Sequence, residues 1–409
     1  MLLQIEERAP QGPPPSGLTP WALGFRPFYL GASIFAALAV PLWALGFAGW
    51  LPTSMAWGLD PLGHAHEMVF GYALAVIVGF LFTAGRQWSG QPTPTGMALA
   101  ALFGLWALAR VLGFVPTAAA LLALVADLAF AWGAAFGLGR ALRRGSNRRN
   151  DFFIVVLIVL GLVGAMVQAA RIGLLSPAPG FGRTALQLGL DGVLFVMVVM
   201  SGRVVPMFTH NSVPTAQVRR LPLLERMAPG GVLALIAADA LAATGLAPIH
   251  GGPLTLLLLA TASALAVRQW LWQPWRTLGT PLVWVLHAAC AWLPLHLGLR
   301  ALAEVGLIAP SIATHALTAG ALGALTLGMM TRTARGHTGQ MLRADRWDIA
   351  IYAAILSSGV LRVGLPLLWP ASLPAAALLS AALWSLAFTL YALRYGPWLM
   401  RPRADGKPG

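Results

Sequence analysis

Charged side chains are scarce in this sequence. Of its 409 residues, 10% are charged and 58% are hydrophobic, whereas charged residues make up about a quarter of an ordinary soluble domain. No long polar block divides the chain into separate units. This composition excludes an ordinary soluble enzyme and predicts a single integral membrane domain.

Cysteine is nearly absent as well. The sequence contains one, Cys290, which excludes a disulfide framework, a thiolate cluster and a Cys-x-x-Cys-His motif for covalently attached haem. Cys290 falls within an apolar stretch, where a free cysteine ordinarily serves as a small buried side chain. A metal site in this chain must therefore use histidine, methionine or carboxylate side chains.

Acidic residues are the scarcer charged class, with 13 Asp and Glu against 27 Lys and Arg and a net charge of +14. The basic residues gather in short breaks between apolar stretches, for example within 140–149 and 332–346. If both termini are cytoplasmic, most of these residues fall on the cytoplasmic face, as the positive-inside rule requires. The charge therefore predicts cytoplasmic N- and C-termini and gives no sign of a nucleic-acid partner.

Twelve apolar stretches recur along the chain, and about 20 apolar residues cross a bilayer core. They lie at residues 28–47, 66–85, 97–112, 118–142, 152–172, 184–205, 228–246, 253–272, 282–302, 314–331, 349–368 and 374–395. The first 22 residues lack the features of a cleavable signal peptide. We expect an all-α membrane protein of about 12 transmembrane helices, with a flexible tail at 1–22, one polytopic domain at 23–396 and a cytoplasmic tail at 397–409.

Two segments, 66–91 and 315–340, match in register without a gap. The shared positions are His66/His315, Gly71/Gly320, Gly79/Gly328, Arg86/Arg335, Gly90/Gly339 and Gln91/Gln340. Their spans, the second and the tenth, run in the same direction, and span six lies midway between them. The spacing suggests three four-helix units with spans 2, 6 and 10 equivalent. The shared glycines would let a bulky planar group approach the backbone.

The eight histidines fall at two depths, and neutral imidazole binds haem iron, copper and zinc. Because both start matching helices, His66 and His315 are the first candidates for a shared haem. His64 precedes His66 by two residues and could serve the same site or a neighbouring one. His287 and His296 lie on one helix about 13 Å apart in height, so each belongs to a different level.

Other side chains suit the same chemistry. Copper accepts imidazole together with methionine thioether, which makes His210 and Met207 candidate ligands near the cytoplasmic face. Guanidinium groups bind carboxylates bidentately, so Arg26 and Arg203 are candidate partners for haem propionates. Intramembrane carboxylates either line a proton path or join helices by hydrogen bonds, and both readings stay open for the three best placed, Glu67, Asp127 and Asp191.

Four blocks carry a family resemblance: GFRPFYLGA at 24–32, HAHEMVFGYALAVIVGFLFTA at 64–84, SGRVVPMFT at 201–209 and THALTAGALGALTLGMMTRTARGHTG at 314–339. In this combination the chain resembles the NnrS family of multi-pass bacterial inner-membrane proteins. The resemblance implies haem b and copper as cofactors and a link to nitric oxide and denitrification. It also favours the histidines inside these blocks as ligands, namely His64, His66, His315 and His337. His210 lies just beyond its block, and GRQWSG at 85–90 departs from the family pattern.

Two functions remain open at this point. The first is a haem- and copper-binding protein that binds, detoxifies or reduces nitric oxide within the bilayer, in the last case as a nitric oxide reductase or another haem-copper oxidoreductase. The chain contains no soluble electron-donor domain, so a quinol or a separate protein would supply electrons. The second is a membrane transporter or metal exporter that uses His, Met and Asp sites. Parallel repeats fit the inverted-repeat transporter designs poorly.

Overall fold

The structure, a computed structural model, describes residues 17–51, 60–114, 118–175, 178–244 and 249–406, and most of the expected N-terminal tail lies outside these ranges. The described residues form helices joined by turns and loops, and no strand occurs among them. The helices are α1 (Phe25–Phe47), α2 (Pro61–His66), η2 (Glu67–Ala73), α3 (Leu74–Ser89), α4 (Gly96–Leu112), α5 (Ala118–Arg144), η3 (Arg148–Asn150), α6 (Phe152–Arg171), α7 (Phe181–Ser212), α8 (Pro222–Thr244), α9 (Gly252–Trp270), η4 (Pro274–Thr277), α10 (Pro281–Glu304), α11 (Pro310–His315), η5 (Ala316–Leu322), α12 (Gly323–His337), α13 (Arg346–Leu368), η6 (Pro370–Ser372) and α14 (Leu373–Met400).

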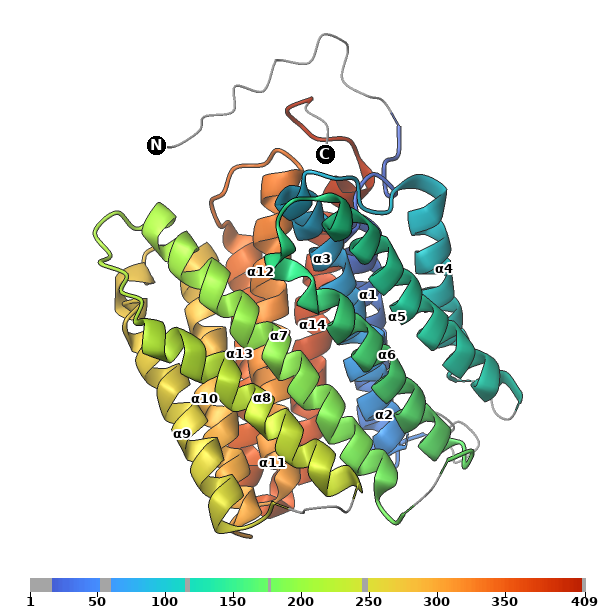
Figure 1. Cartoon of the computed structure of the whole chain (residues 1–409), viewed down its shortest axis with the longest axis vertical. Coiled ribbons are helices and arrows are strands. Elements are labelled where there is room, and N and C mark those ends of the chain that lie inside the picture. Colours follow the sequence, from blue (N-terminus) through green and yellow to red (C-terminus); the bar gives the residue numbers. More distant parts are fainter. Residues whose placement is uncertain (1–16, 52–59, 115–117, 176–177, 245–248, 407–409) are drawn as a thin grey trace.

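The helices follow the predicted apolar stretches one for one and cross the molecule side by side (Figure 1). Within the described ranges, 11 helical segments are long and apolar enough to span a membrane, and α4 is a shorter apolar helix. The expectation of an all-α protein with about 12 spans is therefore confirmed. The last helix continues to Met400, a few residues beyond the predicted end of the membrane domain.

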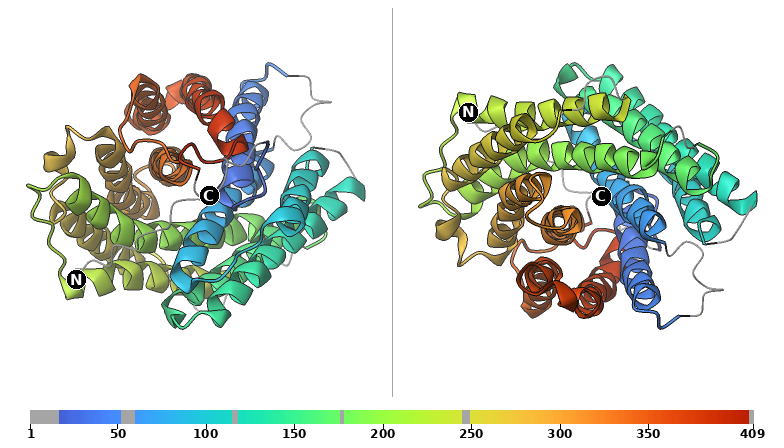
Figure 2. Two further views of the ribbon diagram at one scale, coloured as in Figure 1. Left: turned by 90° about the horizontal axis from the view of Figure 1, so that it is seen from above. Right: turned by 90° about the horizontal axis from the view of Figure 1, so that it is seen from below.

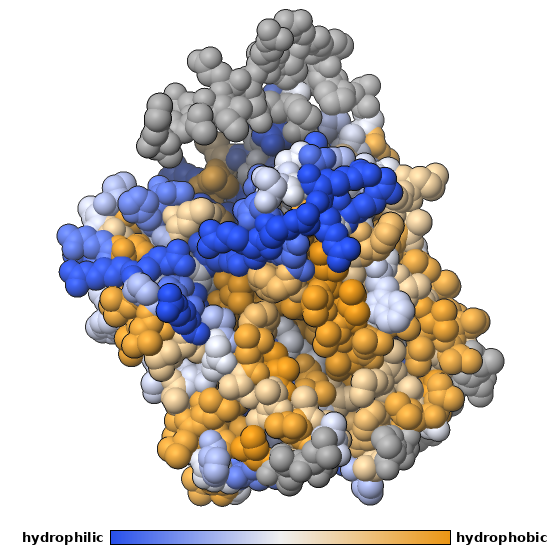
Figure 3. All heavy atoms as spheres, in the orientation of Figure 1, coloured by the Kyte–Doolittle hydropathy of each residue, from blue (hydrophilic) through white to orange (hydrophobic). Residues whose placement is uncertain are grey.

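Both described ends of the chain meet on one face, where the Thr19 amide donates to the Met400 carbonyl over 2.9 Å. We call this the termini face. An even number of crossings brings the two ends to the same side, as the count of twelve predicts. Hydrophilic residues gather toward this end of the molecule, above a broad apolar middle (Figure 3). This banding is the surface expected of a protein embedded in a bilayer.

Spans two, six and ten occupy the interior of the bundle. Their apolar windows are 89%, 72% and 78% buried, whereas the next most buried span reaches 61%. The other helices surround them, and α1 packs against α14 to close the arrangement (Figure 2). The three spans that the sequence singled out thus share a central position.

The repeat extends to an unusual backbone feature. Span two changes from α2 to the π-helix η2 directly after His66, and span ten changes from α11 to the π-helix η5 directly after His315. The π segments cover equivalent residues, whereas α7 in span six is continuous and α-helical. Short π segments occur frequently at functional sites. The backbone therefore confirms the match of spans two and ten, and span six shares only their central position.

The repeat glycines serve helix packing. A Cβ added at Gly71 would lie 2.2 Å from Arg110 Nη1, and one at Gly320 would lie 2.4 Å from the Trp292 ring. In span ten, a Cβ added at Gly328 would likewise lie 2.8 Å from Leu286 Cδ2. The expectation that these glycines make room for a planar cofactor is wrong, because side chains of the surrounding helices occupy the space.

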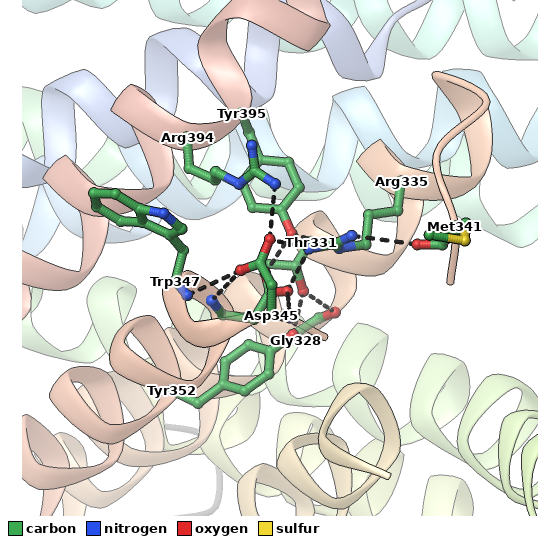
Figure 4. A network of polar contacts seen from close by, with 10 residues as sticks. Gly328, Thr331, Arg335, Met341, Asp345, Trp347, Tyr352, Arg394 and Tyr395 are labelled. Carbon is green, nitrogen blue, oxygen red and sulfur yellow. Dashed lines mark hydrogen bonds and ion pairs between the residues drawn. The ribbon is translucent and has the colours of Figure 1, made fainter. Parts of the chain in front are cut away.

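The repeat arginine of span ten anchors the termini face (Figure 4). Arg335 Nη2 donates to Asp348 Oδ2 over 2.6 Å and to Asp345 Oδ2 over 3.0 Å, and its Nε donates to the Tyr395 hydroxyl. Asp345 and Asp348 together form a capping box at the start of α13. The network ties α12, α13 and α14 together at the end far from the π segments.

Loss of the Arg335 guanidinium should destabilise the bundle strongly. Arg335→Met leaves the fully buried Asp348 carboxylate without its cation, and breaking a buried pair from one side costs about 3–5 kcal/mol. Thermal unfolding of the purified protein in detergent measures the loss. Arg148→Gln is the control, because the Arg148–Asp151 pair is exposed and exposed pairs contribute about 0–1 kcal/mol. Equal melting shifts for the two variants would contradict the structural role.

Candidate functional site

A cavity of about 810 Å³ lies at the face opposite the termini. The ends of α1, α2, α7, α11, α13 and α14 form its walls, so it sits at the outer end of both repeated spans. Its size falls within the range of about 300–1,000 Å³ that is usual for small-molecule and cofactor sites. Apolar side chains make up most of the lining, which also includes the histidines His64 and His315 and the arginines Arg183 and Arg362.

His64 is carried into the cavity by the short helix α2. Asp60 caps this helix, accepting hydrogen bonds from the amides of Leu62 at 3.0 Å and Gly63 at 2.9 Å, and Pro61 occupies the first helical position, where its ring fits best. The His64 ring stacks on Trp43 of α1 with 4.0 Å between centroids and 18° between planes. The cap and the stacked indole together fix the position of this imidazole.

His315 reaches the same cavity from α11. Its Nδ1 lies 2.6 Å from the Ser311 carbonyl oxygen, and a carbonyl only accepts, so Nδ1 carries the proton. In a neutral imidazole, Nε2 then keeps its lone pair. A backbone carbonyl that holds the other ring nitrogen is the usual support of a metal-bound histidine. His315 is close enough to His64 and Arg362 to interact with them electrostatically.

His66 takes a different direction from His315, although the two are equivalent in the repeat. It belongs to a buried cluster in which Nδ1 lies 3.2 Å from Glu67 Oε1 and Nε2 lies 3.8 Å from Asp127 Oδ2. Arg110 of α4 donates to both carboxylates. His66 and His315 therefore do not meet at one site as expected. His64 lines the cavity with His315 instead, and His66 lies in the neighbouring charged cluster.

Glu67 and Asp127 are thus paired with an arginine that the sequence analysis did not single out. The third predicted carboxylate, Asp191, accepts from Arg300 Nη1 at 3.0 Å and from Gln187 Nε2 at 3.0 Å. Arg300 also donates to Asp239. These bonds join α7, α8 and α10, as the helix-joining reading of the carboxylates expects.

The other predicted histidines lie elsewhere. His296 Nδ1 donates to the Ala313 carbonyl over 2.7 Å, and its Nε2 is buried outside the cavity lining. His287 Nε2 lies 2.8 Å from the Thr209 hydroxyl. His337 ends α12 near the termini face, beside the Phe25 ring at 5.5 Å. None of these three lines the cavity with His64 and His315.

The proposed copper ligands His210 and Met207 both lie on exposed positions of α7. Among the residues that the structure describes, no group of three or more His, Cys, Asp or Glu side chains is placed to hold a metal ion. A copper site would therefore need methionine, backbone or ligand groups in addition.

Neither predicted propionate partner faces the cavity. Arg26 donates to the carbonyls of Leu399 at 3.1 Å and Arg401 at 2.6 Å, so it caps the end of α14. Arg203 donates to Asn150 Oδ1 over 2.6 Å near the termini face. Neither lines this cavity, and Arg362, which the sequence analysis did not single out, lines it instead. A lone arginine within an apolar span was the available signal.

The cap of α2 also carries a pH-sensitive ion pair. Asp60 Oδ2 accepts from Arg171 Nε over 2.8 Å. Burial opposes ionisation of this carboxyl, but the hydrogen bonds from Arg171 and the helix amides outweigh it, so the pKa of Asp60 lies below its ordinary value of 3.8. The carboxylate form is therefore the one that holds α2, and with it His64, in place.

Removing this carboxylate should lower stability in a pH-dependent way. Asp60→Ala costs about 1–2 kcal/mol at neutral pH through the lost cap. A depressed pKa stabilises the fold above the unfolded pKa and ceases to do so as pH falls through the folded pKa, so the deficit against wild type should shrink in acid. Melting curves between about pH 7 and pH 3 test this. Asp60→Asn, which keeps the cap oxygen, should show a smaller deficit. A deficit that grows in acid would contradict the assignment.

Nearly the whole chain can be compared with a known protein family. No curated protein matches it. A family model described as NnrS protein matches residues 19–403, a range that includes every transmembrane span and the cavity. With both repeated spans inside the matched region, the chain belongs to the NnrS family.

Proposed function

We propose that the protein binds haem b in the cavity between spans two and ten and uses it to handle nitric oxide in the bacterial inner membrane. One observation carries the proposal: two spans with the same π-helical interruption bring His64 and His315 to one cavity. Imidazole is a common axial ligand of haem iron. Membership of a family associated with nitric oxide supports the choice of ligand.

The donor set fits a haem. His315 is held through Nδ1 by a carbonyl, which leaves Nε2 free to bind iron, and the His64 ring is held flat against Trp43. The cavity is large and mainly apolar, as a tetrapyrrole requires, and Arg362 supplies one positive charge. When bound, a haem would supply an iron centre with affinity for nitric oxide, and the gas would compete with one of the two imidazoles for the iron.

The residues of the chain would then act in three ways. The two imidazoles hold and orient the cofactor. The apolar walls exclude water while admitting a small neutral gas. Behind α2, the cluster of His66, Glu67, Asp127 and Arg110 holds buried acid and base groups next to the cavity helix. This cluster is our candidate for holding protons if the protein reduces nitric oxide, with electrons from a quinol or a separate donor. Copper stays a prediction from the family resemblance.

Loss of either cavity histidine should remove the haem. We expect wild-type protein, purified from cells supplied with haem precursor, to show a Soret band and bound iron, and His64→Ala and His315→Ala to lose most of both. Absorption spectra and iron analysis measure this. His210→Ala and His250→Ala are matched controls, because both side chains are exposed and should leave the spectrum unchanged. A haem-free wild type, or full haem content in both cavity variants, would refute the site.

Reduced wild-type protein should take up nitric oxide. In anaerobic solution with a chemical reductant, we expect a gas electrode to record uptake of at least one nitric oxide per haem, with a shift of the Soret band. Uptake that continues far beyond that amount means reduction, and uptake that stops there means binding. His315→Ala should lose both signals. A haem-loaded wild type that takes up no nitric oxide would refute this function and leave the haem site intact.

A further inference from the structure

Arg362 is an exception among the buried arginines of this protein. Five arginines are buried within the described ranges, and Arg362 is 7% exposed. Arg110, Arg268 and Arg335 each contact at least one carboxylate, and Arg26 donates to backbone carbonyls. Across the described part of the chain, Arg362 makes no ion pair and no side-chain hydrogen bond, and its side chain borders the cavity.

A buried guanidinium without a partner is costly, because its charge is removed from water without compensation. Within membrane spans such residues mark ligand or ion sites. Among the described residues, Asp60 is the one carboxylate that lines the cavity, and it is already bound to Arg171 and to the start of α2. The anion that balances Arg362 must therefore come from a ligand.

Three of the hydroxyl groups around the cavity are also engaged. Ser358, one helical turn from Arg362, donates to the Ser380 carbonyl over 2.8 Å. Thr314 and Thr318 donate to carbonyls one turn back on their own helix, over 3.2 and 3.0 Å. Arg183, the other arginine of the lining, is exposed to solvent, so among the described residues Arg362 is the buried arginine that faces this cavity.

We propose that Arg362 binds a carboxylate of the cofactor that His64 and His315 hold, and so fixes which edge of the macrocycle faces α13. This inference rests on the proposed function. Arg362 is close enough to both imidazoles to interact with them electrostatically, as a group at the edge of a ligand held between them requires. A planar guanidinium binds a carboxylate through two parallel hydrogen bonds. The large apolar volume fits an acidic edge on a large apolar body better than a small inorganic anion.

The test compares haem with its dimethyl ester, which keeps the ring and iron but lacks both carboxylates. Each is titrated into haem-depleted, delipidated full-length protein in detergent, and binding is followed by the Soret band. We expect wild type to bind haem about 10- to 100-fold more tightly than the ester, as loss of charge-assisted hydrogen bonds implies. Arg362→Met should abolish this preference, and Arg362→Lys should keep part of it because it keeps the charge and loses the fork.

Arg332→Met is the matched control. Arg332 is a half-buried arginine of α12 that lies over the Phe208 ring at 3.9 Å, and it does not line the cavity. Its replacement should leave the preference for haem over the ester unchanged. Because the comparison is made first on wild type, it does not depend on the folding of any variant.

The outcomes distinguish failure of the role of Arg362 from failure of the proposed haem site. Equal wild-type affinity for haem and ester overturns the role of Arg362 and leaves the proposed function standing. Binding of neither removes both. If a phospholipid copurifies with wild type and is lost from Arg362→Met while haem binding is unchanged, the anion is a lipid phosphate and the carboxylate assignment is wrong.

Discussion

The structure depends on one constraint: a charge buried within a bilayer needs a partner inside the protein. The chain meets it with arginine–carboxylate pairs that tie distant helices together. Arg110 joins α4 to η2 and α5, Arg300 joins α10 to α7 and α8, and Arg335 joins α12 to α13. Among the residues that the structure describes, the other four buried arginines contact carboxylates or backbone carbonyls and Arg362 contacts neither, so we propose that a ligand binds there.

The two π-containing spans show how one backbone design supports two different surroundings. Both turn from α to π directly after a histidine, yet span two continues with Glu67 where span ten has Ala316. Glu67 brings in Arg110 and with it a charged cluster, so His66 is drawn away from the cavity. In span ten, the apolar Ala316 attracts no such cluster, and His315 lines the cavity together with His64. Divergence at one position thus separates the ligand site from the charged cluster behind it.

Much of this could be predicted from the sequence, and the failures have physical causes. Apolar length fixes the spans, and the register of 66–91 with 315–340 identified the two inner helices. The register could not tell His64 from His66, because side chains two residues apart point to different sides and tertiary contacts choose between them. The chemistry of the guanidinium group suits Arg26 and Arg203 to propionates, but in the structure they donate to backbone carbonyls and to Asn150. Arg362 lies in an apolar span, and its sequence alone does not show whether a carboxylate of another helix pairs with it.

The central claim is that the cavity holds a haem between His64 and His315, and direct imaging tests it best. A cryo-electron microscopy map of the protein purified with its native cofactors should show tetrapyrrole density in the cavity, continuous with both imidazoles, with an acidic edge at Arg362. A map in which lipid chains fill the cavity would contradict the claim, whether haem density then lies near His287 or His337 or is absent altogether.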